Sequence, residues 1–134
     1  MHIIVCLDQN GGMRFNRRRQ SRDAEVCARI LRRAAGSRLW MAPESEKLFF
    51  ADAPEICVDA AFPTAALPGD FCFAEDPALL PDEDKIETLI LYHWNREYPA
   101  DAYFPLSLQG FTLLEQTEFA GTSHERITEE VYGK

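Results

Sequence analysis

The chain has 134 residues, of which 46% are hydrophobic and 27% are charged, and this composition is typical of a single globular domain over residues 1–134. Its apolar runs are too short to cross a bilayer, and its first residues lack the basic region and cleavage site of a signal peptide. We therefore expect a cytoplasmic protein without a membrane partner. The formal net charge of −8 argues against general nucleic-acid binding, because proteins of that class are normally basic.

The charge is divided unevenly along the chain. The first 38 residues contain nine arginines and three acidic residues, whereas the remainder contains five basic and nineteen acidic residues. Such an asymmetry indicates either an edge that binds anions or ion pairs between the two parts of the chain.

Strands and helices alternate in the first half of the chain. Residues 2–7 form an apolar run with β-branched residues, which is typical of a strand buried on both faces. Apolar residues recur at helical spacing between Val26 and Ala34. The arginines of that helix are expected to face outward: Arg29, Arg32 and Arg33. The expected elements are, in order, a strand at 2–7, a basic loop at 13–22, a helix from the N-cap Ser21 to Gly36, a strand at 39–41 and a brief helix from Pro43 to near Phe50.

The second half of the chain reads as strands separated by prolines. The expected elements are strands at 55–58, 70–73 and 86–94, followed by a hairpin of residues 109–119 and 125–132 with its turn at 120–123. Helices early and strands late predict an α/β domain whose mixed sheet has parallel crossovers first and an antiparallel C-terminal edge.

The order of these elements resembles that of dihydrofolate reductase along nearly the whole chain, and the best match is C-terminal. The loop from Asn10 to Asn16 lies between the first strand and the first helix, as an Asn/Gly-containing loop does in that family. The segment from Asp101 to Pro105 resembles the family's Gly-Asp-x-x-Phe-Pro motif before its closing hairpin. The resemblance implies a dihydrofolate reductase-like three-layer fold, with a central mixed sheet of about seven to eight strands and few flanking helices. It also implies that Asp23 occupies the position of the pterin-facing carboxylate.

The sequence departs from the family where the nicotinamide cofactor would bind. Glu44 and Ser45 stand where reductases have a Gly-Arg-x-Thr segment, and Glu75 and Asp76 stand where they have a Gly-Gly pair. Carboxylates repel a pyrophosphate, and the missing cationic and backbone donors remove bonds of about 1.5–3 kcal/mol each. We therefore expect no NADPH-dependent reductase activity and no cofactor.

The basic loop is the main candidate for ligand binding. Guanidinium groups bind phosphates and carboxylates at two points, so these arginines are suited to an anionic small molecule or a nucleotide. The candidate ligand-binding residues are Arg14, Asn16, Arg17, Arg18, Arg19, Arg22 and Asp23. The alternative is that the arginines pair internally with Glu44, Glu75 and Asp76, which would fill the former cofactor groove.

Evidence for catalysis in the sequence is weak. Asp23 is the one candidate catalytic residue, but an ordinary acid in the first turn of a helix, stabilised by the helix dipole, is the favoured explanation. No set of nucleophile, base and orienting acid can be assembled around His93 or His124. No metal site is expected, because no Cys/His cluster occurs, and the four cysteines are expected to be reduced, buried and inert.

The leading hypothesis is a non-reductase protein that binds an anionic small molecule or a protein partner through the arginine-rich loop. The alternative is a divergent pterin- or nucleotide-using enzyme with a substrate pocket at Asp23. A third hypothesis is an interaction protein, with a sheet edge that forms a homo-oligomer.

Overall fold

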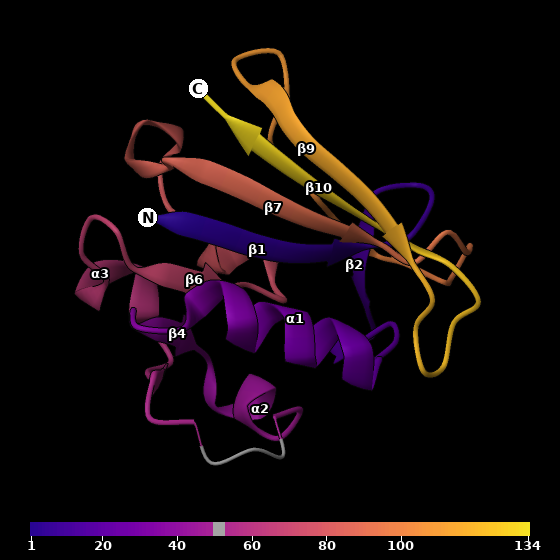
Figure 1. Cartoon of the computed structure of the whole chain (residues 1–134), viewed down its shortest axis with the longest axis horizontal. Helices are drawn as coiled ribbons and strands as arrows, with labels where there is room; N and C mark the ends of the chain where they lie inside the picture. The colour runs from indigo at the N-terminus through magenta and orange to yellow at the C-terminus, as the bar shows by residue number, and fades with distance from the viewer. Residues whose placement is uncertain (50–52) are drawn as a thin grey trace.

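Seven strands form one mixed sheet at the centre of the molecule, and the computed structural model describes residues 1–49 and 53–134 (Figure 1). The strands lie in the order β5 (Ile56–Val58), β4 (Leu39–Met41), β6 (Phe71–Phe73), β1 (His2–Leu7), β7 (Thr88–His93), β10 (Ile127–Gly133) and β9 (Thr112–Phe119). The first five strands in this order are parallel, and β10 and β9 form an antiparallel hairpin. The predicted mixed sheet with an antiparallel C-terminal edge is confirmed.

A second sheet of three short strands packs beside the first. Its order is β3 (Arg18–Arg19), β2 (Gly12–Phe15) and β8 (Ala102–Tyr103). The prediction of a loop over residues 13–22 is therefore wrong. β2 is stabilised by backbone hydrogen bonds to β8, about 90 residues away. An arginine-rich local sequence gives no indication of such a distant partner.

The helices are few and mostly short. They are α1 (Ala24–Ala34), α2 (Pro43–Glu46), α3 (Phe62–Ala65) and the 3₁₀ turns η1 (Pro77–Leu79) and η2 (Glu83–Lys85). The N-cap of α1 is Asp23 and not Ser21, because the Asp23 carboxylate accepts the amide of Glu25. α2 ends at Glu46, and Phe50, where that helix was expected to end, lies outside the described residues.

α1 packs its apolar stripe against one face of the sheet (Figure 1). Val26, Ile30 and Ala34 are buried there against Ile4 and other sheet residues. Ile4 lies on the opposite face of β1 from its neighbours Ile3 and Val5, as the alternation of strand side chains requires. The expected strand buried on both faces is confirmed.

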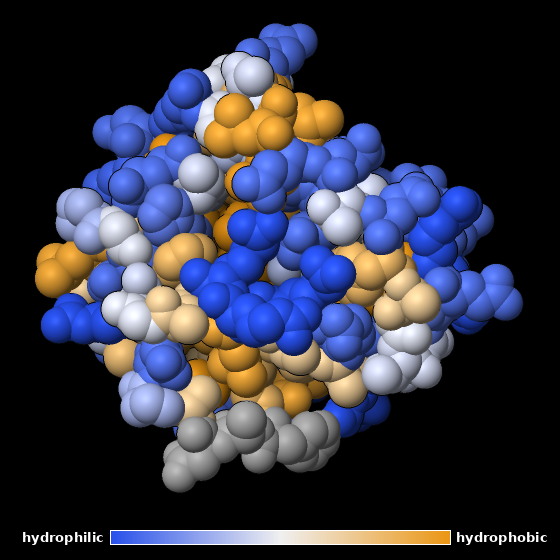
Figure 2. Space-filling view, viewed as in Figure 1, coloured by the Kyte–Doolittle hydropathy of each residue, from blue (hydrophilic) through white to orange (hydrophobic). Residues whose placement is uncertain are grey.

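Two arginines of α1 do not face outward as predicted. Arg33 donates to both oxygens of buried Glu129 on β10, at 3.2 and 3.0 Å, and Arg29 lies 3.6 Å from the same carboxylate. The hydroxyl of buried Tyr92 donates to Glu129 as well, at 2.5 Å. Burying a carboxylate without such partners is unfavourable, so the two guanidinium groups lie against the sheet, where they neutralise Glu129. Figure 2 shows hydrophilic side chains gathered at the centre of this face, over α1.

The other face of the sheet is covered by short helices and loops. α3, the turns after β6 and residues 104–111 contribute the apolar side chains that pack against Ile3, Val5 and Leu89. The helical elements between β6 and β7 are the two 3₁₀ turns η1 and η2, of three residues each. Pro77 is the first residue of η1, where a proline is tolerated.

Candidate functional site

The basic segment of residues 13–22 is a hairpin with Asn16 and Arg17 at its turn. Both residues have left-handed backbone conformations, with φ of 52° and 61°. Asn adopts this conformation readily, whereas for most other residues it is unfavourable by about 1–2 kcal/mol. The Asn16 amide donates to Asp101 Oδ2 at 3.1 Å, and the Asp101 amide donates to the Arg14 carbonyl at 3.0 Å. Asp101 therefore holds the strained turn in place.

Two arginines of the hairpin are paired with the acidic residues that follow β6. Arg14 Nη1 donates to Asp76 Oδ2 at 2.7 Å. Arg19 makes a two-point contact with Glu75, at 2.8 Å from Nε and 2.9 Å from Nη2. The hydrogen bond to Glu75 is the main reason that the pKa of Arg19 is raised. The internal pairing that the sequence left open is present for these two arginines.

The helix α2 completes this network. The Ser45 hydroxyl donates to Glu75 Oε1 at 2.6 Å, and the Glu44 carbonyl accepts a bond from Arg19 Nη2 at 2.9 Å. Ser45 is buried, so Glu75 is fixed from two sides. The acidic residues expected at a former cofactor site thus lie around the hairpin, and they are bonded to it.

A groove of about 330 Å³ lies between the hairpin and α2. Its lining residues are Arg14, Arg17, Arg18, Arg19, Glu44 and Glu75. The side chains of Arg17 and Arg18 are on exposed residues at the hairpin tip, whereas Arg14 and Arg19 are held by their ion pairs. The groove therefore has two fixed and two exposed guanidinium groups.

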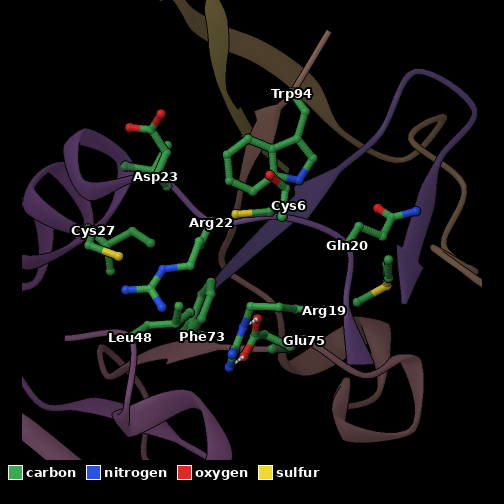
Figure 3. A pocket seen from close by; sticks show the side chains of 15 residues that line it. Cys6, Arg19, Gln20, Arg22, Asp23, Cys27, Leu48, Phe73, Glu75 and Trp94 are labelled. Carbon is green, nitrogen blue, oxygen red and sulfur yellow. Dashed lines mark hydrogen bonds and ion pairs between the residues drawn. The ribbon is translucent and has the colours of Figure 1, made fainter. Parts of the chain in front are cut away.

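A much smaller pocket lies behind the hairpin, beside the N-terminal end of α1 (Figure 3). Its volume is about 20 Å³, which is room for roughly one water molecule. Figure 3 shows the Arg22 side chain lying between Cys27 and Phe73, with the Arg19–Glu75 pair below it. A pterin ring does not fit in this space.

Asp23 is buried, and its carboxylate is bonded to the turn between β9 and β10. Oδ1 accepts bonds from the Glu25 amide, the Thr122 amide and the Thr122 hydroxyl, at 2.9, 3.0 and 3.1 Å. Oδ2 accepts bonds from the Ser123 amide at 2.8 Å and from His124 Nδ1 at 3.0 Å. Burial alone would raise the pKa of Asp23, but these hydrogen bonds hold it well below its usual range. The group is an ionised, fully bonded acceptor, and Figure 3 shows it turned away from the pocket.

His124 connects Asp23 to two hydroxyl groups. Its Nε2 lies 3.0 Å from Ser21 Oγ and 3.0 Å from the Tyr98 hydroxyl. Its ring stacks on Trp94, with the ring centroids 4.6 Å apart and an interplanar angle of 22°. Because ionised Asp23 only accepts hydrogen bonds, Nδ1 carries a proton and donates it to Asp23, which leaves Nε2 to accept from the Ser21 hydroxyl while the Tyr98 hydroxyl donates to Ser21 Oγ.

This cluster could not be predicted from the sequence, and the expectation that no such set forms around His124 is wrong. His124 lies 101 residues from Asp23 and 103 from Ser21, so no short motif contains the three residues. The one local signal was a Ser and an Asp two residues apart before a helix, which was interpreted as capping. Of the two other histidines, His93 bonds to Glu130 Oε1 at 2.5 Å across neighbouring strands, and His2 bonds to Thr88 Oγ1 at 2.5 Å.

The four cysteines are unpaired, as expected. Cys72 is buried, but the other three are only partly buried, which corrects that part of the prediction. Cys6 and Cys27 both line the small pocket. Burial raises the pKa of Cys6 well above its ordinary value, and that of Cys27 to about 11, so both are thiols at neutral pH.

Within residues 1–49 and 53–134, no group of three or more His, Cys, Asp or Glu side chains could hold a metal ion. Over the same residues, none of the helices has the length and apolar character needed to span a membrane. Comparison with protein-family models gives no match for the chain, and comparison with curated proteins gives none either.

Proposed function

We propose that the chain is a non-reductase member of the dihydrofolate reductase-like fold and that it binds a small anionic molecule in the arginine groove. The mixed seven-stranded sheet, the closing hairpin and the position of Asp23 at the start of the first helix support the fold assignment. The sequence resemblance at residues 101–105 adds support. This segment contains β8, which pairs with β2 in the second sheet.

The observation that carries the binding proposal is the strained hairpin tip. Arg17 has a φ of 61°, where glycine is normally preferred, and strained conformations of this kind are concentrated at functional sites. The tip places Arg17 and Arg18 beside the groove, where Arg14 and Arg19 are already oriented by carboxylates. Guanidinium groups fixed in this way lose little conformational freedom when an anion binds.

The same geometry argues against a reductase. The resemblance implies that the backbone at residues 75–76 would receive the cofactor's pyrophosphate, and these residues are two acids bonded to the hairpin instead of the family's glycines. The pocket near Asp23 holds about 20 Å³, and all five hydrogen bonds described above already use the carboxylate. These features also count against the pterin- or nucleotide-using enzyme, and no observation favours that alternative.

A thermal-shift titration with inorganic phosphate, sulfate and citrate tests the proposal, with NADPH and folate in the same series. A ligand at 100 times its Kd adds about 2.7 kcal/mol to the free energy of unfolding. The double variant Arg17→Ala/Arg18→Ala should weaken binding of the best anion more than tenfold, because each charge-assisted bond contributes about 1.5–3 kcal/mol.

The matched control is Arg32→Ala/Arg126→Ala. It removes the same charge from two side chains that are 63% and 67% exposed and lie outside the groove. If the control loses as much affinity, the weaker binding is explained by the change in overall charge, and the proposal that the anion binds in the groove is refuted. Stabilisation by NADPH or folate would refute the non-reductase assignment, and no response to any anion would leave a protein partner as the better hypothesis.

A further inference from the structure

Three side chains beside the small pocket have the arrangement of a nucleophile, a base and an orienting acid. Ser21 Oγ lies 3.0 Å from His124 Nε2, and His124 Nδ1 lies 3.0 Å from Asp23 Oδ2. In hydrolases of several unrelated folds, this order of contacts activates a serine, and it is recognised by geometry and not by sequence position. We propose that Ser21 is a nucleophile that attacks small carboxylic esters, with His124 as its general base and Asp23 as the orienting group.

The base is held more rigidly than a chance contact would require. Asp23 is fixed by four hydrogen bonds besides the one from His124, so the imidazole has a single favourable orientation. Trp94 stacks on the imidazole and fixes its plane. An ionised carboxylate on one side and an aromatic face on the other both stabilise the imidazolium that forms when His124 accepts a proton.

Tyr98 supplies a second hydroxyl at the same position. Its oxygen lies 3.0 Å from His124 Nε2, and its hydroxyl donates to Ser21 Oγ at 3.4 Å. A donor next to the nucleophile is suited to the negative charge that develops on a carbonyl oxygen under attack. Tyr98 is therefore expected to donate to the oxyanion of the tetrahedral intermediate that forms when Ser21 Oγ bonds to the carbonyl carbon.

A groove lies beside the nucleophile. Ser21 is partly exposed, and its neighbour Gln20 and Tyr98 line a groove of about 320 Å³, with Phe15 and Arg18 also in its lining. The apolar part of this groove is suited to the acyl chain of a small ester. Arg18 also lines the anion groove, so an ester that carries a carboxylate or phosphate is the favoured substrate class.

The reaction has two steps, the acylation of Ser21 and the hydrolysis of the acyl-serine. The Oγ–H bond of Ser21 breaks as Oγ bonds to the carbonyl carbon of the ester, and His124 Nε2 takes the proton. The bond from carbon to the alcohol oxygen then breaks, and the departing alcohol takes that proton from Nε2. Water attacks the acyl-serine by the same route, so a carboxylic acid is released and the proton returns to Ser21.

A fluorophosphonate probe tests the nucleophile directly, because it modifies activated serines and leaves a mass increase that peptide mass spectrometry can locate. The folded chain should be labelled at Ser21. Labelling should be lost in Ser21→Ala and unchanged in Ser107→Ala, a control serine that is exposed and lines neither the small pocket nor the two grooves. His124→Gln should slow labelling about a hundredfold or more, since general base catalysis contributes roughly 10²–10⁴-fold.

Removal of His124 also disturbs the buried Asp23, so a second comparison uses the unchanged sequence. The wild-type chain unfolded in urea keeps every serine but loses the triad, and its Ser21 should react no faster than its other serines. Equal labelling of Ser21 in folded and unfolded protein, labelling spread over several serines, or no labelling of the folded protein would each overturn the proposal.

The preference for a charged ester rests on the proposed anion binding, whereas acylation of Ser21 does not. Hydrolysis of p-nitrophenyl acetate and of the p-nitrophenyl monoester of succinic acid separates the two. Arg18→Ala should lower kcat/KM for the succinate ester at least tenfold and leave that for the acetate ester within twofold. If Arg18→Ala affects neither ester, the anion groove fails while the nucleophile stands. If the fluorophosphonate leaves Ser21 unmodified, the nucleophile fails while the groove stands.

Discussion

Replacement of Asp23 by asparagine should destabilise the protein strongly. An asparagine keeps one oxygen, which can still accept from the amides of Glu25 and Thr122. Its NH₂ group takes the place of Oδ2, where the Ser123 amide and His124 Nδ1 both donate. Two bonds to a charged, buried acceptor are lost, and each contributes about 1.5–3 kcal/mol, so the expected loss is about 3–6 kcal/mol. The free energy of unfolding of a typical domain is roughly 5–15 kcal/mol, so this loss is a large part of it.

Urea unfolding at pH 7, followed by circular dichroism, measures this loss. The control is Asp59→Asn, because Asp59 is exposed and accepts a single backbone bond, from the Ala61 amide at 2.8 Å. Asparagine serves well in such a turn, so the control should change the free energy of unfolding by less than about 0.5 kcal/mol. Equal and small losses in both variants would refute the view that Asp23 ties α1 to the C-terminal hairpin.

The same variant carries a pH signature. The pKa of Asp23 is lower in the folded chain than in the unfolded chain. Its contribution to stability is therefore fully present above the unfolded value of about 3.9 and is lost as the pH falls through the folded value. The wild-type protein should lose stability below about pH 4 more steeply than Asp23→Asn. Parallel curves for the two proteins over this range would contradict the assignment.

Two further predictions concern packing and thiol reactivity. Gly121→Ala should destabilise the protein by about 1–3 kcal/mol, because an added Cβ would lie 2.4 Å from Asp23 Oδ2, whereas Gly110→Ala meets only a side-chain oxygen at 3.2 Å and should be tolerated; equal melting temperatures would contradict this. Cys6 and Cys72 should react with a disulfide reagent at pH 8 only after unfolding, because burial raises the pKa of both, that of Cys72 to about 12, and rapid reaction of either in the folded protein would refute it.

Much of the main sheet could be predicted from local sequence pattern. Strands such as Leu39–Met41 and Thr88–His93 are apolar runs bounded by turn residues, and such runs have few alternatives to a buried strand. The hairpin at Gly12–Arg19 was missed because β2 and β3 are stabilised by contacts with β8, far along the chain. The N-cap was misplaced because Ser21 and Asp23 are both suitable capping residues, and tertiary donors select Asp23.

The candidate site was predicted only in part. The sequence identified Arg14 and Arg19 and the acids Glu75 and Asp76 as alternatives for pairing, since opposite charges on two segments suggest contact. It did not identify which arginines pair, because this depends on the register of the hairpin. It also could not bring His124 to Ser21, because that contact exists only when the turn after β9 lies against the start of α1.

The position of β1 has a consequence for the folding of the chain as it is made. β1 lies between β6 and β7, with His2 opposite Phe71 on one side and opposite Thr88 on the other. A nascent chain must therefore carry an apolar first strand without partners until residues far downstream have emerged from the ribosome. Pairing over such sequence distances is slow, in the range of about milliseconds to seconds for domains dominated by non-local contacts. Until β6 and β7 have been made, β1 therefore exposes apolar side chains and unpaired backbone groups of the kind that promote aggregation.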